Sequence, residues 1–243
     1  MATKLSDFRL VVLTPMGSNI FPKNVSCFLS MVSMLQRVFH PASRFLWLEG
    51  GPYLIQNRTY LLRAAMMQDF NNKFDYLLWI DADQVFGVDH MAYLLVTALK
   101  GQLDAVSGLY YNRHGVRHSL AGRIVNGDND IYWLQDKDFG VERSQENVLP
   151  IDVCGFGFFM IHMESLRHYC QQYPRDEWFT ESWHGAKRMH YSGEDVSFCH
   201  QFKKLGRQIW FAPHVQVGHY GGIVPAEFKQ SNMPNRFEEV NMI

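Results

Sequence analysis

A short apolar segment that ends in two aspartates constrains this sequence more than any other feature. Residues 76–80 are apolar or aromatic throughout, which is typical of a strand buried on both faces of a sheet. Asp81 and Asp83 follow at the end of the strand, where ligands bind in open α/β sheets. Because side chains two residues apart in an extended chain point the same way, we expect the two carboxylates to converge and to repel each other unless a cation joins them. Their hard oxygens suit Mg²⁺ or Mn²⁺, which keep positions open for substrate phosphates, whereas the alternative is a surface turn with two solvated aspartates.

The composition is that of one globular domain. The chain has 243 residues, of which 47% are hydrophobic and 19% charged, so it is long enough for a sizeable core and too apolar to be disordered. Its net charge of −1 gives no overall electrostatic case for a nucleic-acid or membrane partner. The four cysteines are widely spaced without a C-x-x-C pair, which indicates neither a zinc site nor a disulfide framework. Since no apolar run is long enough for a signal peptide or a membrane span, we expect a cytoplasmic protein.

The first half of the chain alternates between strand and helix patterns. Short apolar runs predict strands, and apolar residues at helical spacing predict the helices between them. The predicted strands are residues 9–15, 45–48, 76–80 and 104–111, and the predicted helices are residues 25–35, 57–70 and 88–99, the last followed by Gly101 as its expected end. This order predicts a mostly parallel central sheet with helices on both faces.

The second half changes character. Residues 112–150 carry Gly, Asp, Asn and short aromatic runs, which we interpret as short antiparallel strands and long loops. We expect one apolar strand at 153–161, although it contains Gly155 and Gly157. The remaining predicted elements are helices at 164–171 and 196–205, the second ended by Gly206, a loop at 173–191 and a late strand at 209–213.

Two further groups are candidates for chemistry. Glu194 and Asp195 open a helix, whose dipole favours an ionised carboxylate that can take a proton from a hydroxyl. The alternative is a capping box that begins at Ser192 and serves only the helix end. His219 lies in a glycine-rich stretch, where a neutral imidazole could complete a metal site begun by the two aspartates. The alternatives are an ordinary surface histidine and a competing role for His214.

Weaker signals come from two arginines and two glycines. Arg58 and Arg63 could bind phosphates or a nucleotide, although exposed arginines are common on helices. Gly155 and Gly157 could let a sugar ring pass close to the backbone, or they could form a bulge.

Taken in order, these motifs resemble the GT-A glycosyltransferases, closest in pattern to the family-2-like enzymes and their small viral or bacterial relatives. The resemblance runs from Leu10 to about Gly221. Its motifs are Thr14-Pro15, Asn57-Arg58, Asp81-Ala82-Asp83 and residues 106–110, 155–157, 193–199 and 217–221. It implies a single GT-A domain over residues 1–243, with a nucleotide-binding half at about 8–111, an acceptor-side half at about 112–222 and a tail at 223–243.

The resemblance also implies roles for the acids and the histidine. A UDP- or GDP-sugar donor would be held through Mn²⁺ or Mg²⁺. Asp83 would bind the metal, Asp81 would contact the metal or the ribose and sugar, and His219 would complete the metal shell. Asp195 would be the catalytic base of an inverting single displacement, and Glu194 would hold donor or acceptor hydroxyls.

The remaining matched positions concern the nucleotide. Thr14 and Pro15 match the strand end that meets the nucleoside, and Arg58 matches a residue near the base or the phosphates. Glu49 matches only loosely the acidic residue that reads uracil. The signature of processive synthases is absent, which favours a single transfer per event.

We therefore expect a metal-dependent hexosyl- or pentosyltransferase that acts on an acceptor hydroxyl, in the host cytoplasm if the protein is viral. The acceptor would be a glycan or a hydroxymethylated base in phage DNA. For DNA, a local phosphate-binding face could comprise His114, Arg117, His118, Arg123, Lys187 and Arg188. Two alternatives stay open: a phosphohydrolase of the haloacid dehalogenase type, whose D-x-D-x-V motif residues 81–85 fit, and a non-catalytic sugar-nucleotide binder.

Overall fold

The computed structural model describes residues 4–16, 22–49, 53–112, 118–125, 130–184 and 190–219. Its centre is a seven-stranded sheet in the order β2-β1-β3-β10-β5-β13-β8. These strands are β1 (Leu10–Met16), β2 (Arg44–Glu49), β3 (Tyr76–Ile80), β5 (Ala105–Leu109), β8 (Leu149–Ile151), β10 (Phe158–His162) and β13 (Ile209–Gln216). β10 and β8 run antiparallel to their neighbours and the other pairs are parallel, so the predicted mostly parallel sheet is confirmed.

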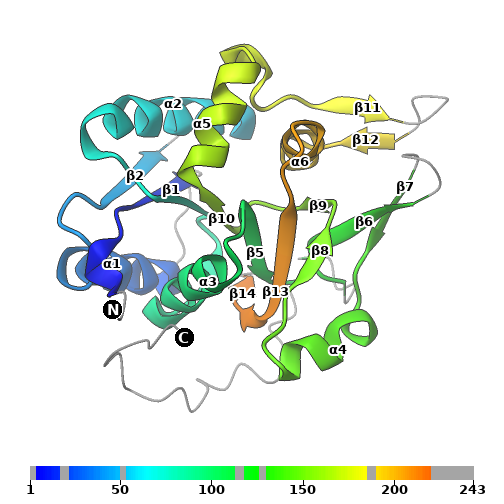
Figure 1. The fold of residues 1–243 in the computed structure, drawn as a ribbon, viewed down its shortest axis with the longest axis horizontal. Helices are drawn as coiled ribbons and strands as arrows, with labels where there is room; N and C mark the ends of the chain where they lie inside the picture. The colour runs from blue at the N-terminus through cyan, green and yellow to red at the C-terminus, as the bar shows by residue number, and fades with distance from the viewer. Residues whose placement is uncertain are drawn as a thin grey trace.

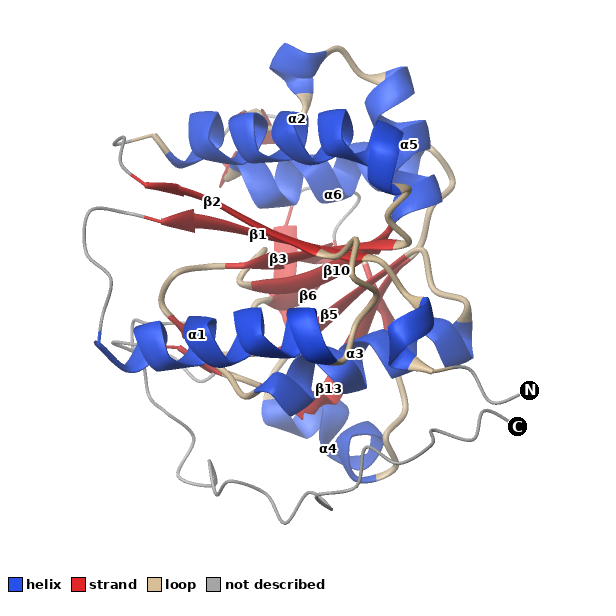
Figure 2. Cartoon of the chain, turned by 90° about the vertical axis from the view of Figure 1, so that its left-hand side faces the viewer, coloured by secondary structure: helices blue, strands red, loops and turns tan. Residues whose placement is uncertain are grey.

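Helices cover both faces of this sheet, as the alternating pattern predicts (Figures 1 and 2). One face carries α1 (Pro22–Arg37) and α3 (Val88–Gly101), and the other carries α2 (Leu54–Asn72), α5 (Met163–Gln172) and α6 (Glu194–Lys204). β3 lies between the two layers and is buried along its whole length. Leu77 and Trp79 pack into one apolar core, while Leu78 and Ile80 pack into the other, which is why this strand has no polar face.

Small antiparallel sheets complete the fold, as predicted for the second half. β6 (Ala121–Val125) lies between β7 (Asp130–Trp133) and β9 (Val153–Cys154), and β11 (Ser182–His184) pairs with β12 (His190–Ser192). A third pair joins β4 (Gln84–Val85) to β14 (Gly218–His219). Short 3-10 turns, η1 (Leu5–Asp7) and η2 (Arg175–Glu177), and one more helix, α4 (Asp136–Ser144), were not predicted.

Three sequence-based predictions are wrong in detail. The single strand at 153–161 is divided by the Gly155–Gly157 turn, so that β9 and β10 belong to different sheets. The loop predicted at 173–191 contains the β11–β12 hairpin. Gly101 is the last residue of α3, and Gln102 takes the left-handed conformation after it, with φ 49°. Gly206, with φ 75°, does end α6 as expected.

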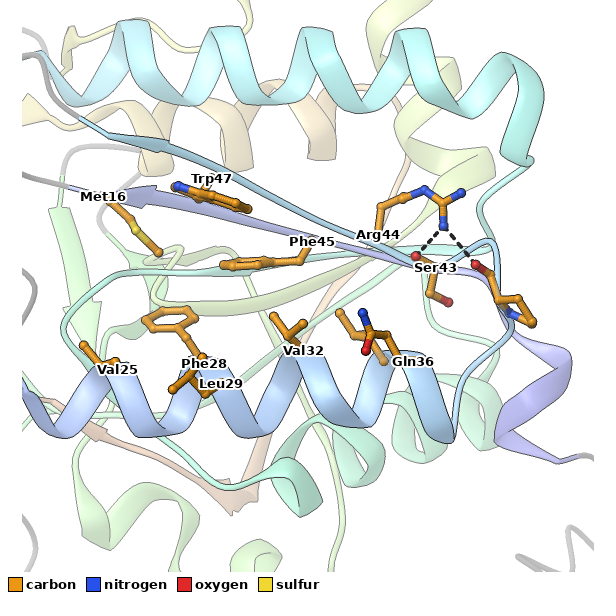
Figure 3. Close-up of a pocket in the computed structure, with 12 residues that line it drawn as sticks. Met16, Val25, Phe28, Leu29, Val32, Gln36, Ser43, Arg44, Phe45 and Trp47 are labelled. Carbon is orange, nitrogen blue, oxygen red and sulfur yellow. Dashed lines mark hydrogen bonds between the residues drawn. The ribbon is translucent and has the colours of Figure 1, made fainter.

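The exposed edge of β2 borders an apolar groove of about 600 Å³ beside α1. Figure 3 shows Val25, Phe28 and Val32 of α1 facing Phe45 and Trp47 of β2 across it. Within the described ranges, no helix combines the length and apolar character that a membrane crossing would need.

Candidate active site

The two aspartates end β3 at the carboxyl edge of the sheet, but they do not continue it as an extended strand. Residues 81–83 form a turn in which the backbone N–H of Gln84 donates to the carbonyl oxygen of Asp81 at 3.1 Å. The extended chain that was expected between the two aspartates is therefore wrong. Instead, each carboxylate has its own partner: Asp81 meets Arg58, and Asp83 meets His219.

His219 reaches Asp83 because β14 pairs with β4, directly after the aspartates. In this register His219 lies opposite Gln84, and His219 Nε2 is 3.5 Å from Asp83 Oδ2. Both side chains are buried. The sequence-based grouping of His219 with these acids thus agrees with the geometry, although more than 130 residues of chain separate them.

The ring of His219 is held from its other nitrogen. His219 Nδ1 lies 2.8 Å from the carbonyl oxygen of Tyr111, which can only accept a hydrogen bond, so Nδ1 carries the hydrogen. The ring of Tyr110 meets His219 edge to face at 5.7 Å. Nε2 is thereby turned toward Asp83, and a backbone carbonyl on the far nitrogen is the usual support of a metal-ligating histidine. His214, the competing candidate, instead lies 3.1 Å from Thr97 Oγ1 through its Nε2.

Arg58 forms ion pairs with a carboxylate of each acidic motif. Its Nη2 donates to Asp81 Oδ1 at 2.9 Å and its Nε donates to Glu194 Oε1 at 3.1 Å, and its side chain is only 2% exposed. The guanidinium lies over the rings of Trp79 and Phe156, at 5.4 and 5.2 Å. Burial alone would lower the pKa of Arg58, but the carboxylates of Asp81 and Glu194 outweigh it and raise the pKa.

The ordinary explanation for helix arginines, exposure to solvent, therefore holds for Arg63 and is wrong for Arg58. The position of Arg58 near a base or a phosphate stays a prediction. Its contacts within the described residues are with carboxylates and aromatic rings.

Asp195 lies at the start of α6, after Gly193 as the N-cap residue. Gly193 has no side chain that could cap the helix. The side chain of Ser192 lies outside the described residues, so the capping box that begins there stays a prediction. The backbone N–H of Val196 donates to Asp195 Oδ1 at 2.7 Å. Burial and then the neighbouring Glu194 raise the pKa of Asp195 to about 7, against an opposing effect of Arg58. The expectation that the helix start favours the ionised form is wrong here, because burial and a like charge outweigh the dipole.

Asp81, Asp195 and His219 line a common cavity of about 300 Å³, a size at the small end of ligand sites. Its lining combines polar and apolar side chains from both halves of the chain. The lining residues are Asp81, Tyr110, Asn112, Leu120, Gly155, Phe156, Asp195 and His219. Four of them, Asp81, Gly155, Asp195 and His219, were candidates from the sequence, and the other four, Tyr110, Asn112, Leu120 and Phe156, were missed as cavity residues.

Gly155 and Gly157 are required by the packing of the chain around them. A Cβ on Gly155 would overlap Tyr110 Oη, and a Cβ on Gly157 would lie 2.6 Å from Gln84 Nε2 and 2.8 Å from Tyr110 Cζ. The backbone therefore comes close to a tyrosine and a glutamine. Gly155 still lines the cavity, so the approach of a sugar ring there remains a prediction.

The predicted nucleoside residues lie at the adjoining carboxyl ends of β1 and β2. Thr14 pairs with Trp47, Pro15 with Leu48, and Met16 with Glu49. Thr14 is fully buried, and neither Thr14 nor Pro15 lines the cavity, while the side chain of Glu49 lies outside the described part of the structure. Their roles stay predictions. Of the predicted DNA-facing set, His118 and Arg123 are described, while His114, Arg117, Lys187 and Arg188 lie outside the described residues, as does Gly221.

The structure brings together two of the three predicted metal ligands, Asp83 and His219. Asp81 is instead paired with Arg58, and its contact with a metal stays a prediction. In the described part of the chain, no group of three or more His, Cys, Asp or Glu side chains is arranged to hold an ion. The donor set of one carboxylate and one supported imidazole suits Mn²⁺ or Zn²⁺ better than Mg²⁺, because imidazole is a borderline ligand. A bound ion would take its remaining ligands from a substrate or from water.

Comparison with known proteins finds relatives in shape and none in sequence. No protein-family description and no curated protein sequence matches the chain. The structure is similar to the crystal structure of A197 from STIV, with a TM-score of 0.55 and 16% identity over 87% of this chain and 85% of that one. It is also similar to the crystal structure of GalNAc-T7 with UDP, GalNAc and Mn²⁺, with a TM-score of 0.54 and 13% identity. That match covers 88% of this chain and 45% of GalNAc-T7, so the chain spans less than half of that protein. At these identities the likeness shows a GT-A-like fold alone.

Proposed function

We propose that this protein is a metal-dependent glycosyltransferase that moves a sugar from a nucleoside diphosphate to an acceptor hydroxyl. The observation that carries the proposal is the cavity at the carboxyl edge of the sheet. A carboxylate with a pKa of about 7 lines it together with His219, which is paired with Asp83. The likeness in fold to a protein crystallised with UDP, GalNAc and Mn²⁺ supports a nucleotide-sugar donor and a divalent ion.

The metal would be held by Asp83 and His219. When bound, such an ion neutralises charge that develops on a leaving diphosphate. Asp81 and Glu194 are tied to Arg58, which keeps two further carboxylates compensated beside the same cavity. We therefore assign Asp81 and Glu194 to hydrogen-bonding substrate hydroxyls rather than to proton transfer.

Asp195 would be the general base. Its pKa of about 7 lets it be ionised in a large fraction of molecules at neutral pH and still accept a proton with useful driving force. The acceptor oxygen would form a bond to the anomeric carbon while its proton moves to Asp195. The bond between that carbon and the diphosphate oxygen breaks, and its electron pair leaves with the diphosphate.

The test measures donor binding and donor turnover separately. Thermal shift with UDP and with GDP, each with and without Mn²⁺, reports binding, since a ligand of the native state raises its apparent stability. Release of the diphosphate from UDP-GalNAc, UDP-glucose and GDP-mannose reports turnover. We expect a stabilising effect of one nucleotide that requires Mn²⁺ and that Asp83→Ala abolishes, with the exposed Asp176→Asn as a matched control.

The same assay addresses the phosphohydrolase alternative. That enzyme class would use Asp81 as a nucleophile and would release inorganic phosphate from simple phosphate esters. Arg58 already engages Asp81 Oδ1 in the described structure, which is unfavourable for such a nucleophile. Phosphate release without any dependence on a nucleotide sugar would contradict the proposal.

A further inference from the structure

Tyr110 is a cavity residue to which neither the sequence nor the proposed mechanism gives a role. It follows β5, and its side chain is 2% exposed although it lines the cavity. Its ring packs edge to face on His219, and its Cζ would lie 2.8 Å from a Cβ on Gly157. The phenol is therefore fixed between the metal-ligand candidate and the Gly155–Gly157 turn.

The hydroxyl of Tyr110 has a proton that no described group accepts. Its oxygen accepts the backbone N–H of Gly157 at 2.8 Å, and among the described residues it makes no other hydrogen bond. An ordinary phenol is protonated at neutral pH, so the hydroxyl of Tyr110 has a hydrogen to donate to a ligand in the cavity.

The hydroxyl of Tyr110 and the carboxylate of the proposed base flank Gly155. A Cβ on Gly155 would overlap Tyr110 Oη and would lie 3.5 Å from Asp195 Oδ2. All three residues line the same cavity of about 300 Å³. A donor and an acceptor that flank one small space match a hydroxyl group, which accepts one hydrogen bond and donates another.

We propose that Tyr110 Oη and Asp195 Oδ2 together bind the reacting hydroxyl of the acceptor. The inference rests on the proposed function. Tyr110 donates to one lone pair of the hydroxyl oxygen, and Asp195 accepts its hydrogen. The second lone pair stays directed at the anomeric carbon. A nitrogen acceptor has one lone pair and cannot both accept from Tyr110 and attack.

The first test replaces Tyr110 by Phe, which keeps the ring and removes only the hydroxyl. Diphosphate release from UDP-GalNAc and UDP-glucose is measured with Mn²⁺, with water and with glycerol as acceptors. We expect kcat to fall about tenfold, the effect of one lost hydrogen bond, while the Kd for UDP with Mn²⁺ changes less than about twofold. An unchanged kcat, or equal losses in kcat and in UDP affinity, would overturn the inference.

A second pair of variants separates this role from packing. The methyl group of Gly155→Ala would overlap Tyr110 Oη, yet would lie 3.4 Å from Cζ and 3.5 Å from Asp195 Oδ2. We expect Gly155→Ala to lower the melting temperature, and Tyr110→Phe/Gly155→Ala to recover it, because the phenylalanine leaves room for the methyl group. Turnover should stay low in both. Recovery of turnover together with stability would mean that Tyr110 only fills space, and would overturn the inference.

The acceptor class is tested with the wild-type protein. Transfer to glycerol should exceed transfer to aniline, a neutral amine, and the opposite order would overturn the assignment of an alcohol acceptor. A preference for aniline would contradict the acceptor hydroxyl of the proposed function as well, whereas the outcomes for Tyr110→Phe and Gly155→Ala concern the inference alone. If UDP with Mn²⁺ does not bind the wild-type protein, the proposed function falls and the inference falls with it. If it binds and is turned over, an unaffected Tyr110→Phe variant overturns only the inference.

Discussion

Two hollows among the described residues differ in size and in chemistry, and the smaller one is the better candidate for catalysis. The groove between α1 and β2 measures about 600 Å³, and the cavity at the carboxyl edge measures about 300 Å³. Most side chains that line the groove are apolar. Its charged residue, Arg44, donates through Nη1 to the carbonyl oxygens of Pro41 and Ser43, as Figure 3 shows.

In the cavity, by contrast, polar groups are held by buried partners and directed at a shared space. Arg58 donates to Asp81, and the carbonyl oxygen of Tyr111 orients the ring of His219. The backbone N–H of Gly157 donates to the hydroxyl of Tyr110. Burying a polar group costs free energy, and here each buried polar partner fixes a side chain that faces the cavity. This is the arrangement that a ligand-binding site needs. The comparison teaches that the support of polar groups, rather than volume, distinguishes a site from a hollow.

The largest expected effect tests the cavity directly. Asp195→Asn removes the proposed base and keeps its shape, so we expect turnover to fall by about 10²–10⁴-fold. The Kd for UDP with Mn²⁺ should change little, because Asp83 and His219 remain. In the wild-type protein, turnover should rise with pH through about 7, where Asp195 loses its proton. Near-normal turnover of the variant, measured beside Asp176→Asn, would mean that Asp195 is not the base.

Replacement of Arg58 should have a large effect on the free energy of unfolding, whereas replacement of Asp195 should affect mainly turnover. Arg58→Met leaves the buried Glu194 and the partly exposed Asp81 without their cation, which should lower the free energy of unfolding by about 3 kcal/mol. Urea denaturation measures this, and Arg63→Met on the exposed face of the same helix is the matched control. If the two variants were equally stable, the buried ion pairs would not hold the two acidic motifs together.

His219 should determine the metal dependence. His219→Ala removes one of two described ligand candidates, so we expect the Mn²⁺ concentration required for UDP binding to rise by at least about tenfold. When the metal is chelated, the variant and the wild-type protein should no longer differ in UDP binding. His214→Ala is the matched control, since that histidine contacts Thr97 outside the cavity. An equal Mn²⁺ requirement in both variants would favour a simple pairing of His219 with Asp83 over a metal site.

The sequence predicts the strands and helices of the first half of the chain well, because β1, β3 and β5 are buried on both faces and their apolar runs are continuous. It misses α4, in which Phe139 is the buried residue of a short, charged helix. It also cannot predict the β4–β14 pairing, because two-residue strands have no periodicity, although this pairing brings His219 to Asp83. The burial of Arg58 is equally hidden, since most arginines are exposed.

Tyr110 shows the same limit within the site. A tyrosine at the end of a buried strand is indistinguishable in sequence from one that only completes a core, and its neighbours Gly155 and Gly157 lie 45 or more residues later. The two glycines carry the one available signal, since glycine inside an apolar run indicates close approach by another group. The identity of that group comes only from the folded chain.

The smallest expected effect comes from the groove. Leu29 is 67% exposed on the α1 side of the groove, so Leu29→Ser should change the free energy of unfolding by less than about 0.5 kcal/mol. Turnover and Mn²⁺-dependent UDP binding should match the wild-type protein, because no residue of the groove lines the cavity. A loss of UDP affinity of more than about threefold would contradict the separation of the two hollows. The nucleoside would then extend from the ends of β1 and β2 into the groove, where Met16 and Trp47 would contact it.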